Sequence, residues 1–148
     1  MLGELRPDEI EKLLSEETVG RIGCHLEGRT YVVPITYCYD GEAVHAHSRE
    51  GLKLQMMRRN PEVCLEVDRM RDLSNWESVI AWGRFEELHG PAAMTALRKL
   101  VQHVMPMIHS ETSLPSHAER PHGLGAGVFD ATVFRIVLTE KTGRFERS

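Results

Sequence analysis

Residues 46–54, AHSREGLKL, join a strand-like run to a helix-like run and place Ser48, Gly51 and Lys53 at the junction. The first backbone N–H groups of a helix have no partner within the helix, and the helix dipole is positive there, so a helix start binds anions. The Ser48 hydroxyl, the open backbone at Gly51 and the Lys53 ammonium suit a phosphate group. A cation in a first helical turn is otherwise unfavourable by about 0.3–1 kcal/mol. The alternative is an ordinary helix start, with Ser48 as N-cap and Lys53 exposed, and this stretch alone leaves both open.

The histidines, eight in all, are the other residues that could do chemistry. His45 and His47 alternate along one strand-like run and therefore share a face. No Ser-His-Asp or Cys-His arrangement can be assigned, so the catalytic residues are unknown. Four further histidines flank one loop at loose spacings that no Cys or acidic ligand joins, so we expect no metal site there, with haem binding as an alternative: His103, His109, His117 and His122.

Length and composition describe an ordinary globular chain. Its 148 residues, 41% hydrophobic, predict a single domain over residues 1–148. A net charge of −4 without a basic and aromatic surface argues against a nucleic-acid partner. No apolar stretch approaches the roughly 20 residues that span a bilayer, so we expect no membrane association and a cytoplasmic location. The three cysteines lie in apolar runs and are expected to be buried free thiols.

The elements that must position these residues follow from periodicity and turn signals. Helices are predicted where Pro opens a run with apolar spacing of three and four, and strands where apolar and polar residues alternate. A polar connection over 68–75 and a loop over 109–127 separate them. The predicted helices are 7–16, 51–59 and 91–105, and the predicted strands are 18–26, 30–39, 42–48, 62–67, 76–88 and 128–140.

Three local features refine this outline. Asp40-Gly41 predicts a hairpin with a type I′ turn, and Pro34 predicts a locally open or bulged strand. The apolar face predicted for the last helix consists of Met94, Leu97, Val101 and Val104 or Met105. Two tryptophans six residues apart on one strand, Trp76 and Trp82, predict packing in the core or at a subunit interface, with stacking on a flavin as the alternative. Since the turns are too short for crossovers, we expect an antiparallel sheet that forms a small β-barrel with peripheral helices.

An ordered set of motifs adds a resemblance to this outline. The segments are TYVVPITYCYDGEAVHAHSREGLKLQMMRRNPEVCLEV and then WESVIAWGRFEEL. The set resembles the FMN-binding split-barrel superfamily of the pyridoxamine 5'-phosphate oxidases over roughly residues 5–90. Within that superfamily it is most similar to the flavin-nucleotide-binding branch that includes the nitroimidazole-resistance (Nim-type) proteins. The resemblance implies a mainly β fold with peripheral helices, an FMN-binding split β-barrel.

The resemblance also implies a homodimer that binds FMN at the subunit interface. By matching positions, one strand would line the isoalloxazine ring, and a following turn would reach the ribityl and phosphate end. A later strand would contact the flavin from this or the partner subunit. The ring-lining residues are Val32, Val33, Pro34, Ile35 and Thr36, those at the ribityl and phosphate end are His47, Ser48 and Lys53, and the later contact is Ser78.

The chain departs from true pyridoxamine-phosphate oxidases on the substrate side. Their helix after the fifth strand supplies Tyr, Arg and Ser to the substrate phosphate, and TALRKLVQHV lacks that spacing. Their closing Trp and Arg-x-His segment has no counterpart in VFRIVLTEKTGRFERS. We therefore expect an FMN-dependent oxidoreductase that passes electrons from a reduced nicotinamide to a small acceptor such as a nitro-aromatic. A flavin-binding or carrier module without turnover, or a haem-handling protein, is the alternative.

Overall fold

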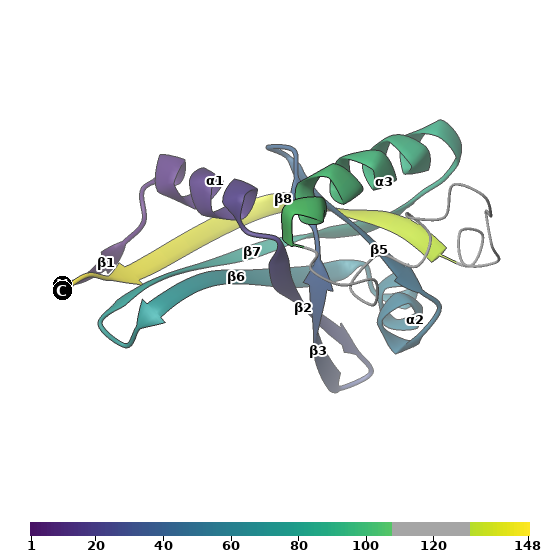
Figure 1. Ribbon diagram of the computed structural model, residues 1–148. Coiled ribbons are helices and arrows are strands. Elements are labelled where there is room, and N and C mark those ends of the chain that lie inside the picture. The colour runs from purple at the N-terminus through teal and green to yellow at the C-terminus, as the bar shows by residue number, and fades with distance from the viewer. Residues whose placement is uncertain (108–130) are drawn as a thin grey trace.

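One antiparallel sheet organises the computed structural model, which describes residues 1–107 and 131–148 (Figure 1). Its eight strands follow the order β3-β2-β6-β7-β8-β5-β4, and β1 pairs with β8. This mainly β architecture is the predicted split barrel. The predicted loop over 109–127 and the expected start of the last strand lie outside the described residues. The strands are β1 (Leu2–Glu4), β2 (Val19–Leu26), β3 (Arg29–Thr36), β4 (Cys38–Tyr39), β5 (Ala43–Arg49), β6 (Glu62–Asp72), β7 (Asn75–Leu88) and β8 (Ala131–Glu146).

The helices lie close to their predicted positions. They are α1 (Pro7–Glu16), α2 (Leu52–Arg59) and α3 (Gly90–Val104), the last followed by the short 3-10 helix η1 (Met105–Met107). None of the helices in the described part of the chain is long and apolar enough to cross a membrane. The predicted apolar stripe of α3 is right at Val104, which is buried, but wrong at Met94, which is 53% exposed. Ala96 and Leu100, which the predicted stripe did not include, are buried instead. Ala96, Leu100 and Val104 recur every four residues and therefore form one buried side of this helix.

The type I′ turn predicted for Asp40-Gly41 occurs instead in the β2–β3 hairpin, for which no turn type was predicted. Glu27 and Gly28 both have positive φ, at 51° and 81°, as a type I′ turn requires. In the β4–β5 hairpin the central residues are Gly41 and Glu42, and only Gly41 has positive φ, at 97°. The hairpin at Asp40-Gly41 is confirmed, but the type I′ prediction is wrong. Asp40 stands one position earlier and stabilises the turn with its carboxylate.

The polar connection predicted over 68–75 is also wrong. Strand β6 continues to Asp72, and its partner β7 begins at Asn75, so only Leu73 and Ser74 form the turn. Polar residues are stable in this part of the sheet because they pair with the end of α1: Arg69 donates from Nη2 to Glu16 Oε2 at 2.9 Å and from Nε to Oε1 of the C-cap residue Glu17 at 2.7 Å. Strand β7 is also held by backbone pairing with both of its neighbours, β6 and β8.

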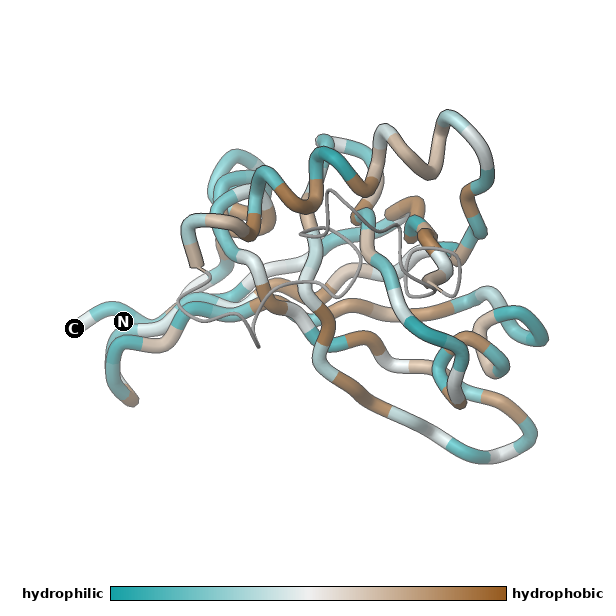
Figure 2. The backbone as a smooth tube through the Cα atoms, turned by 45° about the vertical axis from the view of Figure 1, so that its right-hand side comes forward, coloured by the Kyte–Doolittle hydropathy of each residue, from teal (hydrophilic) through white to brown (hydrophobic). Residues whose placement is uncertain are grey.

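The core lies inside the barrel between the inner sheet face and α1 and α2. Alternate residues of β6 are buried as predicted, with Val63, Leu65 and Val67 inside and Cys64 half-buried on the other face. Figure 2 shows apolar colour concentrated along the middle of the strands and polar colour at the turns, with both chain ends side by side. The antiparallel pairing of β1 with β8 holds those ends together.

Candidate functional site

The β3 residues predicted to line a flavin ring divide between two faces. Val32, Pro34 and Thr36 are exposed on the outer face, whereas Ile35 is buried in the core and Val33 is half-buried. The strand pairs with β2 from Val19↔Thr36 to Leu26↔Arg29 without a register shift. The predicted bulge at Pro34 is therefore wrong: β3 ends the strand order of the sheet, where a missing N–H is tolerated. Because β3 pairs with β2 on one side only, the backbone groups on its other side are unpaired in the sheet without any bulge.

The junction of β5 and α2 favours the anion interpretation over the simple cap. Gly51 is the N-cap in extended backbone (φ 176°), and no side chain caps the helix. The Ser48 hydroxyl donates to the carbonyl of Arg49 at 2.9 Å, so Ser48 is not the N-cap. The nearest atom to a side chain built at Gly51 is 3.9 Å away, so the backbone there is open. The first-turn N–H groups of α2 thus keep their capacity to bind an anion.

Lys53 is the most informative residue of this junction. It lies in the first turn of α2 and is half-buried, and it forms no ion pair with any carboxylate in the described part of the chain. Burial lowers the pKa of its ammonium, and the neighbouring Cys24 thiol partly opposes that shift. A partly buried, unpaired cation costs free energy unless an anion joins it. The interpretation of Lys53 as merely exposed does not hold.

The other two residues predicted to contact the flavin, His47 and Ser78, lie far from each other in the sheet. His47 is half-buried on β5, opposite Val133 of β8, and directly precedes Ser48. Ser78 lies near the start of β7 and donates from Oγ to Glu66 Oε2 at 3.1 Å. Figure 1 places the β6–β7 turn and α2 at opposite ends of the molecule. Within one chain, Ser78 is therefore remote from Lys53.

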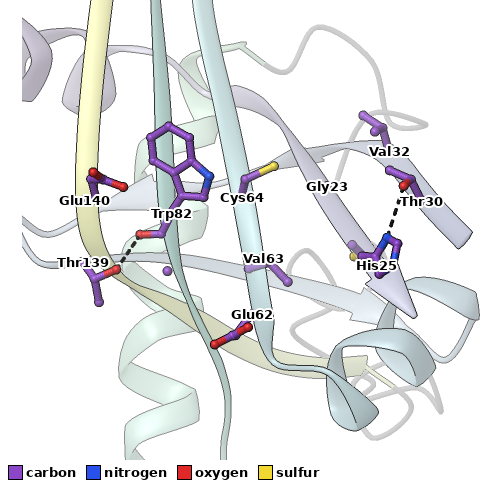
Figure 3. A pocket seen from close by; sticks show the side chains of 12 residues that line it. Gly23, His25, Thr30, Val32, Glu62, Val63, Cys64, Trp82, Thr139 and Glu140 are labelled. Atoms are coloured by element: carbon purple, nitrogen blue, oxygen red, sulfur yellow. Dashed lines mark hydrogen bonds between the residues drawn. The ribbon is translucent and has the colours of Figure 1, made fainter. Parts of the chain in front are cut away.

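A hollow of about 500 Å³, which was not predicted from the sequence, lies on the outer sheet face (Figure 3). Trp82, Val32 and Cys64 contribute its side-chain walls, and Gly23 forms its floor between them. A Cβ at Gly23 would lie 2.7 Å from Cys64 Sγ, so glycine is the residue that fits at the floor of this hollow. The sequence shows that Val32 and Trp82 belong to strand-like runs, but it does not show which strands lie beside one another.

The histidine cluster considered for metal or haem is only partly described. His109, His117 and His122 lie outside the described residues. The Nε2 atom of His103 is 2.8 Å from the carbonyl oxygen of Glu17 and donates to it, so that nitrogen is occupied. Among the residues that the structure describes, no three His, Cys, Asp or Glu side chains gather as a metal site.

Comparison with known proteins identifies the family. The family model described as pyridoxamine 5'-phosphate oxidase matches residues 6–145. The chain belongs to this family. It is 32% identical over 81 residues to the uncharacterized protein RA0666 of Rhizobium meliloti (strain 1021), a match that covers 55% of this chain and 54% of that relative. The matched region thus spans about half the length of this curated relative.

Comparison with solved structures extends the likeness over nearly the whole chain. A FAD-binding protein from Mesorhizobium loti is 32% identical, with 98% of each chain covered and a TM-score of 0.71. A candidate 5-nitroimidazole antibiotic resistance protein from Bacteroides thetaiotaomicron is 21% identical, with 98% of this chain and 87% of that chain covered and a TM-score of 0.73. The first likeness extends to sequence and fold, and the second shows the fold alone.

Proposed function

We propose that this chain is a flavin-dependent oxidoreductase, with FMN as its flavin. The observation that carries the proposal is the unpaired, half-buried Lys53 at the uncapped start of α2. The terminal phosphate of FMN is a dianion, which matches one ammonium and a row of first-turn N–H groups. The Mesorhizobium loti protein, 32% identical over nearly its full length, is described as FAD-binding, which supports a flavin in this chain.

The residues present fit the flavin at two points. Lys53, the open backbone at Gly51 and the first turn of α2 would hold the phosphate, with Ser48 and His47 toward the ribityl chain. The exposed edge of β3 would present backbone groups to the ring, with Val32 and Pro34 against its face. Bound there, the flavin would supply hydride acceptance from a reduced nicotinamide and electron transfer to a small acceptor. The chain's own part is to bind, orient and shield it.

We further propose that two copies of the chain form a homodimer around the cofactor. Large apolar side chains lie exposed on the outer sheet face: Val32 at 61%, Ile80 at 41% and Trp82 at 40%. Exposed apolar patches of this kind mark interaction surfaces. Ser78, remote from Lys53 in its own chain, lies on the same outer face and could contact the partner's flavin. A nitro-aromatic is the acceptor suggested by the Nim-type sequence motifs.

The test is an absorbance spectrum of the purified protein with added FMN, followed by FAD in a parallel titration. We expect flavin absorbance that remains with the protein after desalting, tighter binding of FMN than of FAD, and oxidation of NADH or NADPH with a nitro-aromatic acceptor. A colourless protein that binds neither flavin contradicts the proposal. Flavin that is reduced by dithionite but by neither nicotinamide would instead assign the chain as a flavin carrier.

A further inference from the structure

A β-bulge lies at the hollow on the outer sheet face. The register of β7 and β8 shifts after Trp82, which pairs with Glu140. The next residue, Gly83, pairs with Leu138, so Thr139 has no partner of its own on β7. Its Oγ1 donates to the carbonyl oxygen of Trp82 at 3.2 Å (Figure 3). Because β-bulges are common beside active sites, where they redirect side chains, this one marks the hollow as a candidate ligand site.

The walls of this hollow suit a flat aromatic molecule. Val32, Val63 and Cys64 line it with apolar atoms, and the indole of Trp82 stands beside them (Figure 3). Trp82 is 40% exposed, so part of its ring remains free to stack. The volume of about 500 Å³ lies within the range of small-molecule sites. An aromatic ring placed here would gain stacking or edge-to-face contact with the indole as well as burial of its own surface.

The fixed charges that line the hollow are negative. Glu62 of β6 and Glu140 of β8 line it, both are exposed, and neither forms an ion pair within the described part of the chain. No lysine or arginine is among the described residues that line it. Arg84, opposite Glu62 on β7, forms no ion pair with it and does not line the hollow. Even with the His25 ring of the wall protonated, the two carboxylates leave a net negative charge, which repels an anionic ligand and favours an uncharged or cationic one.

The hollow adjoins the proposed flavin site at two residues. Val32, expected against the flavin ring, is also a wall of the hollow. A ligand in the hollow would therefore lie next to the ring, with both in contact with this side chain. Cys24 also lines the hollow. Burial and the neighbouring Cys64 raise the pKa of the Cys24 thiol, and the Lys53 ammonium partly opposes that rise, so the proposed phosphate site is close as well.

We propose that this hollow binds the electron acceptor as an uncharged or cationic aromatic molecule, stacked on Trp82 and selected by Glu62 and Glu140. The inference rests on the proposed function for the ligand's role as acceptor, whereas binding itself needs no flavin. A cationic ring gains from the indole face and from both carboxylates. A phosphorylated ring meets two like charges instead, consistent with TALRKLVQHV, which lacks the spacing of the oxidases' phosphate ligands. The charge of the hollow thus separates this chain from oxidases that act on a phosphorylated substrate.

The first measurement detects the ligand on Trp82 itself in the flavin-free chain. The chain has two tryptophans, so Trp76→Phe leaves Trp82 as the sole tryptophan fluorophore. Three nitro-aromatic probes of similar size differ in charge near pH 7: 4-nitrobenzylamine is a cation, 4-nitrobenzyl alcohol is neutral and 4-nitrobenzoate is an anion. Because two carboxylates act on the ligand, we expect saturable quenching with a dissociation constant that rises about tenfold at each step from cation to anion. Quenching that does not saturate, or three equal constants, would overturn the proposal.

Variants measured by isothermal titration separate the roles of charge and stacking. Glu62→Gln combined with Glu140→Gln should bring the three dissociation constants within about threefold of one another. Glu146→Gln, on the same face of β8 but outside the hollow, should keep the steps of about tenfold. Trp82→Ala should weaken binding of 4-nitrobenzylamine by about tenfold or more, whereas Ile80→Ala, 41% exposed on the same strand and face, should change it by less than about twofold. A charge order that survives the double substitution contradicts the proposal.

Other occupants of the hollow give different results. If FMN displaces the bound probe, the flavin ring itself occupies the hollow, and if the probe dissociates the dimer in light scattering, a second copy occupies it. Either result rejects the proposal. We expect FMN and 4-nitrobenzylamine to bind together and the dimer to persist with both. Because Glu62 and Glu140 are exposed, their double substitution provides the test even if Trp82→Ala does not fold, as judged by circular dichroism.

Turnover separates this inference from the proposed function. A wild-type chain without bound flavin rejects the proposed function and with it the role of the ligand as acceptor. With flavin bound, the double substitution at Glu62 and Glu140 should raise the KM for 4-nitrobenzylamine about tenfold and lower the KM for 4-nitrobenzoate about tenfold. Normal flavin binding and NADH oxidation, with acceptor KM values that do not depend on these two glutamates, reject only the present inference.

Discussion

Lys53→Ala tests the phosphate site at the start of α2 directly. A hydrogen bond to a charged group contributes about 1.5–3 kcal/mol, so loss of the ammonium should weaken FMN binding by that amount. In dissociation constant this is about 10- to 150-fold. Isothermal titration of FMN into the flavin-free protein measures it. Because the contact is ionic and only half-buried, added salt should weaken wild-type binding more than binding by the variant.

The flavin-free protein gives a second, opposite expectation for the same variant. Burial lowers the pKa of Lys53, and no carboxylate in the described residues pairs with it, so its ammonium is a cost in the absence of ligand. Lys53→Ala should therefore unfold at a temperature no lower than the wild type, while FMN should raise that temperature much less. Lys12→Ala, at an exposed lysine of α1 that lies 4.0 Å from Glu16, is the matched control and should bind FMN normally. Unchanged FMN affinity in Lys53→Ala would refute the phosphate site.

Three further variants test the acid stability, the interface and the core. Burial raises the pKa of Asp40, but hydrogen bonds from His45, Ala43 and Glu42 outweigh it and hold the folded pKa at about 2, below its ordinary value of 3.8. Its stabilisation is therefore complete above about pH 4 and is lost as pH falls toward 2. Because 35% of the Asp40 side chain is exposed, we expect its ionised form to contribute roughly 1 kcal/mol to the free energy of unfolding. Between pH 6 and pH 3, that free energy, measured by urea unfolding, should therefore fall less in Asp40→Asn than in the wild type. Trp82→Glu, at an outer-face residue 40% exposed, should shift a dimer to monomer in light scattering, whereas Met94→Glu on α3 should not. Tyr37→Phe removes the 2.8 Å hydrogen bond to the carbonyl of Leu14 and should cost roughly 1–3 kcal/mol of unfolding free energy without changing FMN affinity.

Features set by neighbouring residues in the chain were predictable. Pro7 with Asp8 and Glu9 starts α1 as expected, and Gly51 and Lys53 lie at a helix start because a strand, a glycine and a helical run follow one another. The short turns also gave the antiparallel topology, since crossovers need more residues than they offer. These inferences needed no knowledge of which distant segments meet.

Features set by distant segments were not predictable. Strand character in 68–72 depends on pairing with β7 and on ion pairs from α1, which the polar sequence conceals. The buried side of α3 depends on how the helix packs on the sheet, and the hydrophobic pattern alone predicted Met94 as well as Val104 on that side, although only Val104 is buried. The outer hollow needs β2, β3, β6, β7 and β8 side by side. Each of these is a property of the sheet order.

The edge position of β3 links the cofactor proposal to the dimer proposal. Natural edge strands avoid unwanted pairing by charge, proline or cover. On its outer face β3 carries Val32, Pro34 and Thr36, so proline protects one position and no charge protects the other two. The neighbouring outer face adds Ile80 and Trp82, both exposed in a single chain. A flavin along the edge and a second copy over the face would cover both surfaces, so one assembly accounts for an exposed apolar edge and an unpaired Lys53 together.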